Sequence, residues 1–307
     1  MIVYRELSSI ENDLGIPIKT LYALSNSVGA HYHEKRIPKS DGGTRILSVP
    51  DKPLKSVQRA IADKLLAYEP VSVYAKAYKV GSSVRKNAAC HVGKSKLLKL
   101  DIYKFFDSIS YYSVKEKAFP KDKYSEKIRI LLAMLCYKGD SLPQGAPTSP
   151  IISNIIMREF DERVGDWCLD RKIVYTRYCD DMTFSGDFDE SAVIAFVSEG
   201  LKALGFILNE KKTRCIEKGS RKTVTGIVVN DKLNTSKDYR REIRQTMYYC
   251  LRFGVTEHIN RTGSTQSPSE FLNSLLGKVN YVLQITPENS EFLSYRYELL
   301  EMIKDSK

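Results

Sequence analysis

Two adjacent carboxylates, Asp180 and Asp181, are the residues of this sequence most able to do chemistry as a pair. The segments on either side, residues 172–177 and 182–185, are rich in β-branched and aromatic residues, so we expect a β-hairpin with both aspartates at its tip. Neighbouring carboxylates repel each other unless they are protonated or bridged by a cation, and a hard divalent metal ion is their natural partner. Taken alone, such a pair is more often a solvated turn, because aspartate is a favoured turn residue.

Two other motifs accompany the pair and overturn the simpler interpretation. Asp101 lies in an apolar segment, residues 96–102, that predicts a β-strand. Residues 142–150 have the sequence LPQGAPTSP, which predicts a loop running into a helix, with Ser149 as the N-cap and Pro150 at the first helical position. A strand aspartate, a Pro-Gln-Gly loop and a Tyr-x-Asp-Asp hairpin, in this order, resemble the palm of a reverse transcriptase.

The resemblance implies a mixed α+β fold, the right-hand polymerase fold, with fingers, a palm made of an antiparallel sheet with helices, and a helical thumb. We expect the fingers, with N-terminal helices, over residues 1–95. The palm is expected over residues 96–235, with an interleaved fingers segment at about residues 110–140. Residues 236–307 are expected to form a helical, RNA-binding thumb. A chain of 307 residues is long enough for a core divided over such parts.

The charge balance of the chain points to a polyanionic partner. The formal net charge is +11 and the isoelectric point is near 9.2, which is typical of proteins that bind nucleic acid and, less often, an anionic membrane. The six cysteines have no Cys-x-x-Cys spacing, which argues against a zinc ribbon, and scattered thiols suit a reducing cytosol. Because the sequence has no apolar leader and no long apolar run, we expect a cytoplasmic protein with no membrane partner.

The resemblance assigns roles to the three aspartates. DNA synthesis is an in-line attack of a primer hydroxyl on the α-phosphorus of a deoxynucleoside triphosphate, and two Mg²⁺ ions can stabilise both the attacking and the leaving oxygens. In the family, the residues that match Asp101 and Asp180 bridge the two ions, and the one that matches Asp181 ligates less directly. Lys212, in an Asn-x-x-Lys pattern, would donate a proton to the leaving pyrophosphate, although Lys211 beside it leaves this assignment open by one position.

A basic hairpin is predicted over residues 36–47, with its turn at an Asp-Gly pair. Arginine offers a triphosphate a bidentate fork, and lysine offers it a point charge. By itself such a hairpin would be interpreted as solvated. In the family it matches the fingers motif that holds the incoming nucleotide, so the resemblance assigns Lys39 and Arg45 to nucleotide binding.

Three further residues are expected to contact the nucleotide. Phe106 follows Asp101 closely, and an aromatic residue there closes the pocket of the family against a 2′-hydroxyl. Phe105 beside it is the better candidate for the core. Gln144 and Gly145 would approach the nucleotide, since glycine allows close backbone contact.

Two short motifs narrow the resemblance to retron reverse transcriptases. The pattern Asn-Ala-x-x-His precedes the Asp101 strand and matches that family in sequence and position, although a lone histidine near an asparagine is more often structural. Val-Thr-Gly is the second hallmark, and it is weak as a bare tripeptide. Residues 238–253 interleave arginines with tyrosines, which suits a thumb that grips an RNA–DNA duplex. The residues expected to bind RNA are Asn87, His91, Val224, Thr225, Gly226, Arg240, Arg241 and Arg244.

Membership of the retron family would imply an RNA-directed DNA polymerase that copies its own structured non-coding RNA, of msr–msd type, from dNTPs into single-stranded DNA (msDNA). Synthesis would start at an internal 2′-hydroxyl of that RNA, and such systems generally act in antiphage defence with a separate effector protein. One alternative is a group II intron-like reverse transcriptase, which usually carries a longer maturase domain. The other is a catalytically silent RNA-binding scaffold, which would be expected to have lost at least one of the three aspartates.

Overall fold

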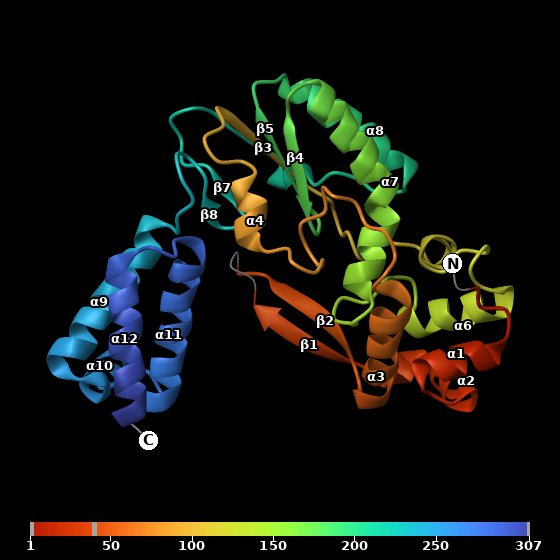
Figure 1. Ribbon diagram of the computed structural model, residues 1–307, viewed down its shortest axis with the longest axis horizontal. Coiled ribbons are helices and arrows are strands. Elements are labelled where there is room, and N and C mark those ends of the chain that lie inside the picture. The colour runs from red at the N-terminus through yellow and green to blue at the C-terminus, as the bar shows by residue number, and fades with distance from the viewer. Residues whose placement is uncertain (1–2, 39–41, 306–307) are drawn as a thin grey trace. The chain divides into compact units, whose positions relative to one another are not determined.

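The computed structural model describes residues 3–38 and 42–305, which form two compact units (Figure 1). Unit 1 comprises the chain up to Ser82 together with Leu98–Cys215, and unit 2 comprises Ser83–Leu97 and the chain from Ile216 onward. Helices and antiparallel strand pairs occur together, which confirms the expected α+β class. The assignment of fingers, palm and thumb to residue ranges stays a prediction.

Unit 1 is organised around a four-stranded sheet with the strand order β4-β5-β3-β6. Its strands are β3 (Lys96–Asp101), β4 (Val174–Tyr178), β5 (Asp181–Gly186) and β6 (Arg214–Ile216), of which β3 and β6 extend slightly past the boundary of the unit. The antiparallel pairing of β4 with β5 confirms the hairpin predicted around the two aspartates. The helices α7 (Ser149–Asp170) and α8 (Glu190–Ala203) lie beside this sheet (Figure 1).

The predicted start of α7 is wrong by one residue. Thr148 is the N-cap, and Ser149 is already helical, so Pro150 occupies the second helical position. Proline is tolerated there as well, because the N–H groups of the first helical turn have no partner within the helix. The Ser-Pro pair therefore predicts the helix correctly but not the residue that caps it.

The remaining elements of unit 1 pack into one apolar core with the sheet. The hairpin of β1 (Tyr32–Pro38) and β2 (Thr44–Pro50) is antiparallel, and its expected Asp-Gly turn falls mostly on residues 39–41, outside the described residues. The helical segments are α1 (Leu7–Leu14), α2 (Ile18–Asn26), η1 (Val28–His31), α3 (Lys52–Ile61), η2 (Ala62–Leu66), α5 (Tyr111–Ser113), η3 (Val114–Ala118), α6 (Glu126–Cys136) and η4 (Glu210–Lys212).

Unit 2 contains a short helix, a small hairpin and four longer helices. These are α4 (Val84–Ala89), β7 (Thr223–Val224), β8 (Ile227–Val228), α9 (Lys237–Phe253), α10 (Val255–Thr262), α11 (Pro268–Ile285) and α12 (Ser290–Asp305). The sequence Ser-Pro-Ser-Glu predicts a capping box, and Ser267 and Glu270 form one at the start of α11. One apolar cluster lies among α9, α11 and α12, and a smaller one joins α4 to the hairpin and to Ile285 of α11.

Two expectations drawn from composition can be compared with the structure. All six cysteines are free thiols. Among residues 3–38 and 42–305, no helix combines the length and the apolar character needed to cross a membrane.

The loop that carries the Pro-Gln-Gly sequence is fastened to strand β2. The Ser48 backbone N–H donates to the Gln144 carbonyl at 2.8 Å, and Lys138 Nζ donates to Ser48 Oγ at 3.1 Å. Gly145 has φ +126°, and a Cβ atom at this position would lie 2.7 Å from the Ser48 carbonyl oxygen. Glycine is therefore required here by the close approach of two backbone segments, and the contact joins the β1–β2 hairpin to the rest of unit 1.

Gly145→Ala should destabilise the protein by roughly 3 kcal/mol or more, because it adds both backbone strain and a clash with an atom that cannot rotate away. Gly139→Ala is a matched control in the same loop, since Gly139 also has a positive φ but has open space around its Cβ position. That control should cost only about 1–2 kcal/mol. Urea denaturation of both variants checks this, and equal losses would contradict the role of the Ser48 contact.

Candidate active site

A cavity of about 880 Å³ in unit 1 brings together most of the residues expected to do chemistry. The expected residues that line it are Arg45, Asp101, Phe106, Gln144, Asp180, Asp181 and Lys212. Gly145 is not part of the lining, because it packs against Ser48. Lys39 lies outside the described residues, so its expected contact with the nucleotide stays a prediction.

Strand pairing explains how aspartates far apart in the sequence meet. Tyr178 pairs with Asp181, so only Cys179 and Asp180 form the loop of the hairpin. β3 is the neighbour of β5 in the sheet, which brings Asp101, the last residue of β3, close to the hairpin tip. The backbone N–H of Ile102 donates to the Asp180 carbonyl at 3.2 Å. Strand pairing thus positions Asp101 and Asp181, and a main-chain hydrogen bond ties the hairpin loop at Asp180 to the residue after β3.

The Asp101 carboxylate is buried and has partners on both oxygens. Its Oδ2 atom accepts a hydrogen bond from Lys212 Nζ at 2.8 Å, and its Oδ1 atom accepts one from Asn209 Nδ2 at 2.9 Å. Burial lowers the pKa of Lys212, but the hydrogen bond with Asp101 and the nearby negative charges outweigh this effect and raise it. Lys212 rather than Lys211 therefore faces the carboxylates, carrying an ammonium at neutral pH.

Repulsion among the carboxylates is visible in Asp181. Its pKa is raised to about 6, first by loss of solvation and then by the negative charges of Asp180 and Asp101. The side chain still reaches solvent, so charge repulsion is the part of this shift that bears on the chemistry. A cation in the cavity would relieve that repulsion.

The donor set fits a hard divalent cation, because carboxylate oxygens are the ligands that Mg²⁺ prefers. Within the described part of the chain, no three histidine, cysteine, aspartate or glutamate side chains already converge on a common point. Asp101, Asp180 and Asp181 share one cavity, and a cation would have to displace Lys212 from Asp101 to use that carboxylate fully. These residues are the ones that would hold Mg²⁺, and their role as ligands stays a prediction.

The aromatic residues after β3 divide between the core and the cavity. Phe105 is buried against Phe206, with 5.6 Å between ring centroids. Phe106 packs edge-on against Phe105, is half-buried and turns toward the cavity, which it lines together with Arg45 and Gln144. This arrangement agrees with the expected division of the two rings. The proposed function of Phe106 in excluding a 2′-hydroxyl is not tested by it.

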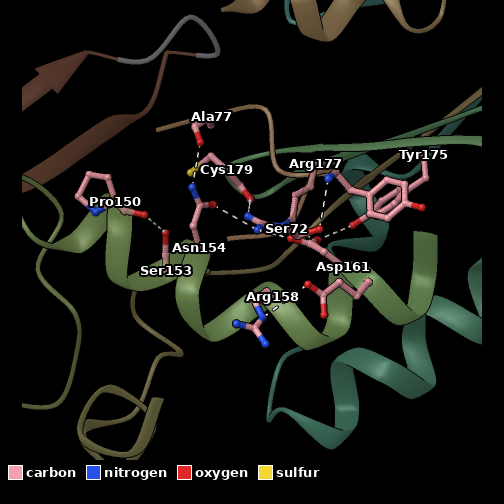
Figure 2. A network of polar contacts seen from close by, with 12 residues as sticks. Ser72, Ala77, Pro150, Ser153, Asn154, Arg158, Asp161, Tyr175, Arg177 and Cys179 are labelled. Carbon is pink, nitrogen blue, oxygen red and sulfur yellow. Dashed lines mark hydrogen bonds and ion pairs between the residues drawn. The ribbon is translucent and has the colours of Figure 1, made fainter. Parts of the chain in front are cut away.

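Sequence reasoning assigned no role to Tyr78, Asn209 or Arg177. Tyr78 lines the cavity and its hydroxyl donates to Cys179 Sγ at 3.4 Å, but it lies in an irregular stretch that carries no periodic signal. Asn209 was visible only as the first residue of the Asn-x-x-Lys pattern. Arg177 is fully buried behind the hairpin (Figure 2). It lies two residues after buried Tyr175 on the same strand, and therefore on the same face of the sheet, which is the signal that could have found it.

The two short retron motifs lie together in unit 2, where α4 packs against the β7–β8 hairpin. Asn87, His91 and Val224 are buried, so any part they take in RNA binding would be indirect in this structure. Thr225 and Gly226 form the two-residue hairpin loop, with φ +47° and +82°, as a type I′ turn requires. Gly226 is exposed and Thr225 is half-buried, and RNA binding by all five residues stays a prediction.

The three arginines expected to contact RNA differ in their surroundings. Arg240 donates to Asn234 and Thr235, and Arg244 forms a bidentate ion pair with Glu291, with both N···O distances at 2.7 Å. The side chain of Arg241 is 79% exposed and lies 3.3 Å from that of Asp238, which is 71% exposed. Exposed pairs of this kind are weak, so Arg241 is the arginine most available to a phosphate.

Comparison with known proteins agrees with the geometry. The family model "Reverse transcriptase (RNA-dependent DNA polymerase)" matches residues 37–272, so the chain belongs to the reverse transcriptase family. Within that family it belongs to the retron reverse transcriptases. It is 30% identical to the retron Ec83 reverse transcriptase of Escherichia coli, over 89% of each chain. It is 31% identical to the retron Mx65 reverse transcriptase of Myxococcus xanthus, over 87% of this chain and 64% of that protein.

A solved structure of apo telomerase from Candida tropicalis is also similar, at 14% identity and a TM-score of 0.49. The match covers 89% of this chain and 58% of the telomerase chain. The family assignment does not depend on this likeness.

Replacing Lys212 by glutamine should strengthen binding of Mg²⁺ or Mn²⁺ to the substrate-free protein by roughly two- to fivefold, because the competing ammonium on Asp101 is removed. Isothermal titration calorimetry measures this. Lys211→Gln is the matched control, since Lys211 is exposed and does not line the cavity, and it should leave the affinity unchanged. If both variants bind the ion more tightly by the same factor, only net charge matters and Lys212 has no special place.

Proposed function

We propose that this protein is a retron-type RNA-directed DNA polymerase that copies a cognate structured RNA, of msr–msd type, into single-stranded msDNA. Its substrates are dNTPs, its cofactor is a pair of Mg²⁺ ions, and synthesis is primed from an internal 2′-hydroxyl of the RNA. A separate effector protein and a role in antiphage defence complete the proposal. The observation that carries the polymerase activity is the cavity that Asp101, Asp180 and Asp181 line together with Arg45, Gln144 and Phe106.

The residues of the cavity divide the chemical work among them. When bound to Asp101, Asp180 and Asp181, Mg²⁺ would supply charge stabilisation to the attacking and the leaving oxygens. Arg45 offers a guanidinium fork to the triphosphate, whose negative charge would otherwise be repelled by the aspartates. Lys212 holds a proton at Nζ, and once it has left Asp101 it can transfer that proton to the leaving pyrophosphate.

The remaining parts of the chain are proposed to hold nucleic acid. The β1–β2 hairpin belongs to the fingers and the sheet of unit 1 to the palm, and helices α9 to α12 form the thumb. Arg241 and Gly226 are exposed, and together with the half-buried Thr225 they are the residues best suited to contact RNA backbone or unpaired bases. Neither alternative is favoured by a specific observation. The similarity to retron enzymes argues against a group II intron-like reverse transcriptase. The presence of all three aspartates in the cavity argues against a catalytically silent scaffold.

Asp180→Asn and Asp101→Asn should each reduce Mg²⁺-dependent DNA synthesis by roughly 1,000-fold or more, because each removes a charge that would hold the ions, while RNA binding persists. Primer extension and RNA filter binding measure the two properties. Asp187→Asn is the control, since Asp187 is an exposed carboxylate just after β5 that does not line the cavity. Near-normal synthesis by either catalytic variant would refute the polymerase assignment. Sequencing the nucleic acid that co-purifies with the wild-type protein tests whether its product is DNA joined to RNA.

Phe106→Val should admit ribonucleotides, because it removes the ring that we propose to block the 2′-hydroxyl. The quantity to measure is the ratio of dNTP to rNTP incorporation on one template. This ratio has its own internal control, since a general loss of activity lowers both rates together. An unchanged ratio would mean that Phe106 only packs against Phe105.

A further inference from the structure

A buried ion pair lies directly behind the hairpin that carries the aspartates. Figure 2 shows the Arg177 side chain, on β4, between Asp161 of α7 and the Cys179 carbonyl. The side chains of Arg177 and Asp161 are both 0% exposed. Asn154 and Asp161 are two helical turns apart, so α7 presents both of them to the strand on one face.

The guanidinium of Arg177 donates four hydrogen bonds at once. Nε and Nη2 donate to the two carboxylate oxygens of Asp161 at 2.8 and 2.6 Å, and Nη2 also donates to Asn154 Oδ1 at 3.2 Å. Nη1 donates to the Cys179 carbonyl oxygen at 2.8 Å. Asn154 is itself held, because its Nδ2 donates to the Ala77 carbonyl at 2.9 Å. The group that reaches the turn is therefore anchored on its other side.

The contact with Cys179 fixes more than one residue. Cys179 has φ +63°, a backbone conformation that residues other than glycine rarely adopt. The turn therefore needs an external partner to hold it. The Cys179 carbonyl belongs to the peptide plane before Asp180, and the Asp180 carbonyl, which accepts from the Ile102 N–H at 3.2 Å, belongs to the plane after it. The two planes that flank a residue define its φ and ψ. Holding both planes therefore sets the direction in which the Asp180 side chain leaves the backbone.

We propose that Arg177 is a positioning residue for the Asp180 carboxylate. Anchored to Asp161 and Asn154, its guanidinium holds the Cys179 carbonyl and so orients Asp180 toward the cavity. This role rests on the proposed polymerase function, because it matters for catalysis only if Asp180 acts there.

Lysine cannot replace the guanidinium in this role. A lysine keeps the positive charge and can pair with Asp161, but its single ammonium lacks the planar fork that reaches Asp161 and the Cys179 carbonyl in different directions. Arg177→Lys should therefore lower kcat by about 100-fold, as expected for a misplaced reacting group, and leave KM for the dNTP within about twofold. Steady-state kinetics on a supplied primer–template measures both.

Tyr175→Phe is the matched control within the same network. The Tyr175 hydroxyl donates to Asp161 Oδ1 at 2.8 Å but makes no contact with the Cys179 carbonyl. This variant should lose thermal stability, as Arg177→Lys does, and keep kcat within about twofold. If the kcat values of both variants fall in proportion to their loss of Tm, Arg177 is only structural and the proposal is overturned.

A double variant keeps the test decisive should the lysine variant not fold. Arg177→Met combined with Asp161→Leu replaces the ion pair by apolar groups, a change that buried pairs often tolerate. It should fold, bind RNA and still show the loss of kcat, because nothing then holds the Cys179 carbonyl. Wild-type kcat in this double variant would overturn the proposal.

Hydrogen exchange of the Asp180 and Asp181 amides, followed by NMR, separates this inference from the proposed function. Exchange should be faster in Arg177→Lys than in the wild type and in Tyr175→Phe. Equal exchange rates in the two variants would overturn the positioning role whatever their activity. A wild-type protein that synthesises no DNA would instead overturn the proposed function.

Discussion

Repulsion among three carboxylates is the interaction that the rest of unit 1 has to withstand. The strand order sets Asp101 beside Asp180 and Asp181, and loss of solvation, together with the negative charges of Asp180 and Asp101, raises the pKa of Asp181. Lys212 and Asn209 offset part of the repulsion at Asp101. The same charges make the cavity receptive to a divalent cation, and any cation that binds the folded state alone would stabilise it. The repulsion among the carboxylates is therefore greatest in the cation-free site, which is the form that can bind a cation.

The ion pair between Arg177 and Asp161 places a second electrostatic demand on the same region. Taking both charges out of water is costly, and removing only one partner of such a pair typically costs about 3–5 kcal/mol. Cys179 adds backbone strain of about 1–3 kcal/mol through its positive φ. The network in Figure 2 joins these two features, because the guanidinium that balances Asp161 also holds the strained turn. Helix α7 is in this way part of the support of the hairpin that carries Asp180 and Asp181.

The sequence predicts those parts of the site that depend on local patterns. The hairpin around Asp180, the strand that ends in Asp101 and the capping box of Ser267 each follow from neighbouring residues, and each is present. Gly145 shows where local reasoning ends, since its requirement for glycine comes from the Ser48 backbone, almost a hundred positions away, and not from a ligand. Contacts of this kind depend on the tertiary fold, which no short motif encodes.

The burial of individual side chains is the other property that short motifs do not predict. Asn87 and His91 belong to a pattern associated with RNA, but both side chains are inside unit 2. Arg177 is the reverse case, because no motif in the sequence indicates that it is more than a polar residue on a strand. Whether a polar residue faces solvent or the core depends on which element packs against it, and here that element is α7.

The discontinuity of unit 2 has a consequence for biosynthesis. Its first segment, Ser83–Leu97, contributes Ala88 and Leu97 to a small core whose other members lie at Val224 and beyond. A ribosome adds residues at a rate of about 5–20 per second, so this segment waits on the order of ten seconds for its partners. During that interval its apolar residues have no core of their own, while the strands of unit 1 that follow can already pair. The nascent chain would therefore pass through a state in which strands of unit 1 are paired and an apolar segment is exposed, which is the kind of surface that chaperones bind.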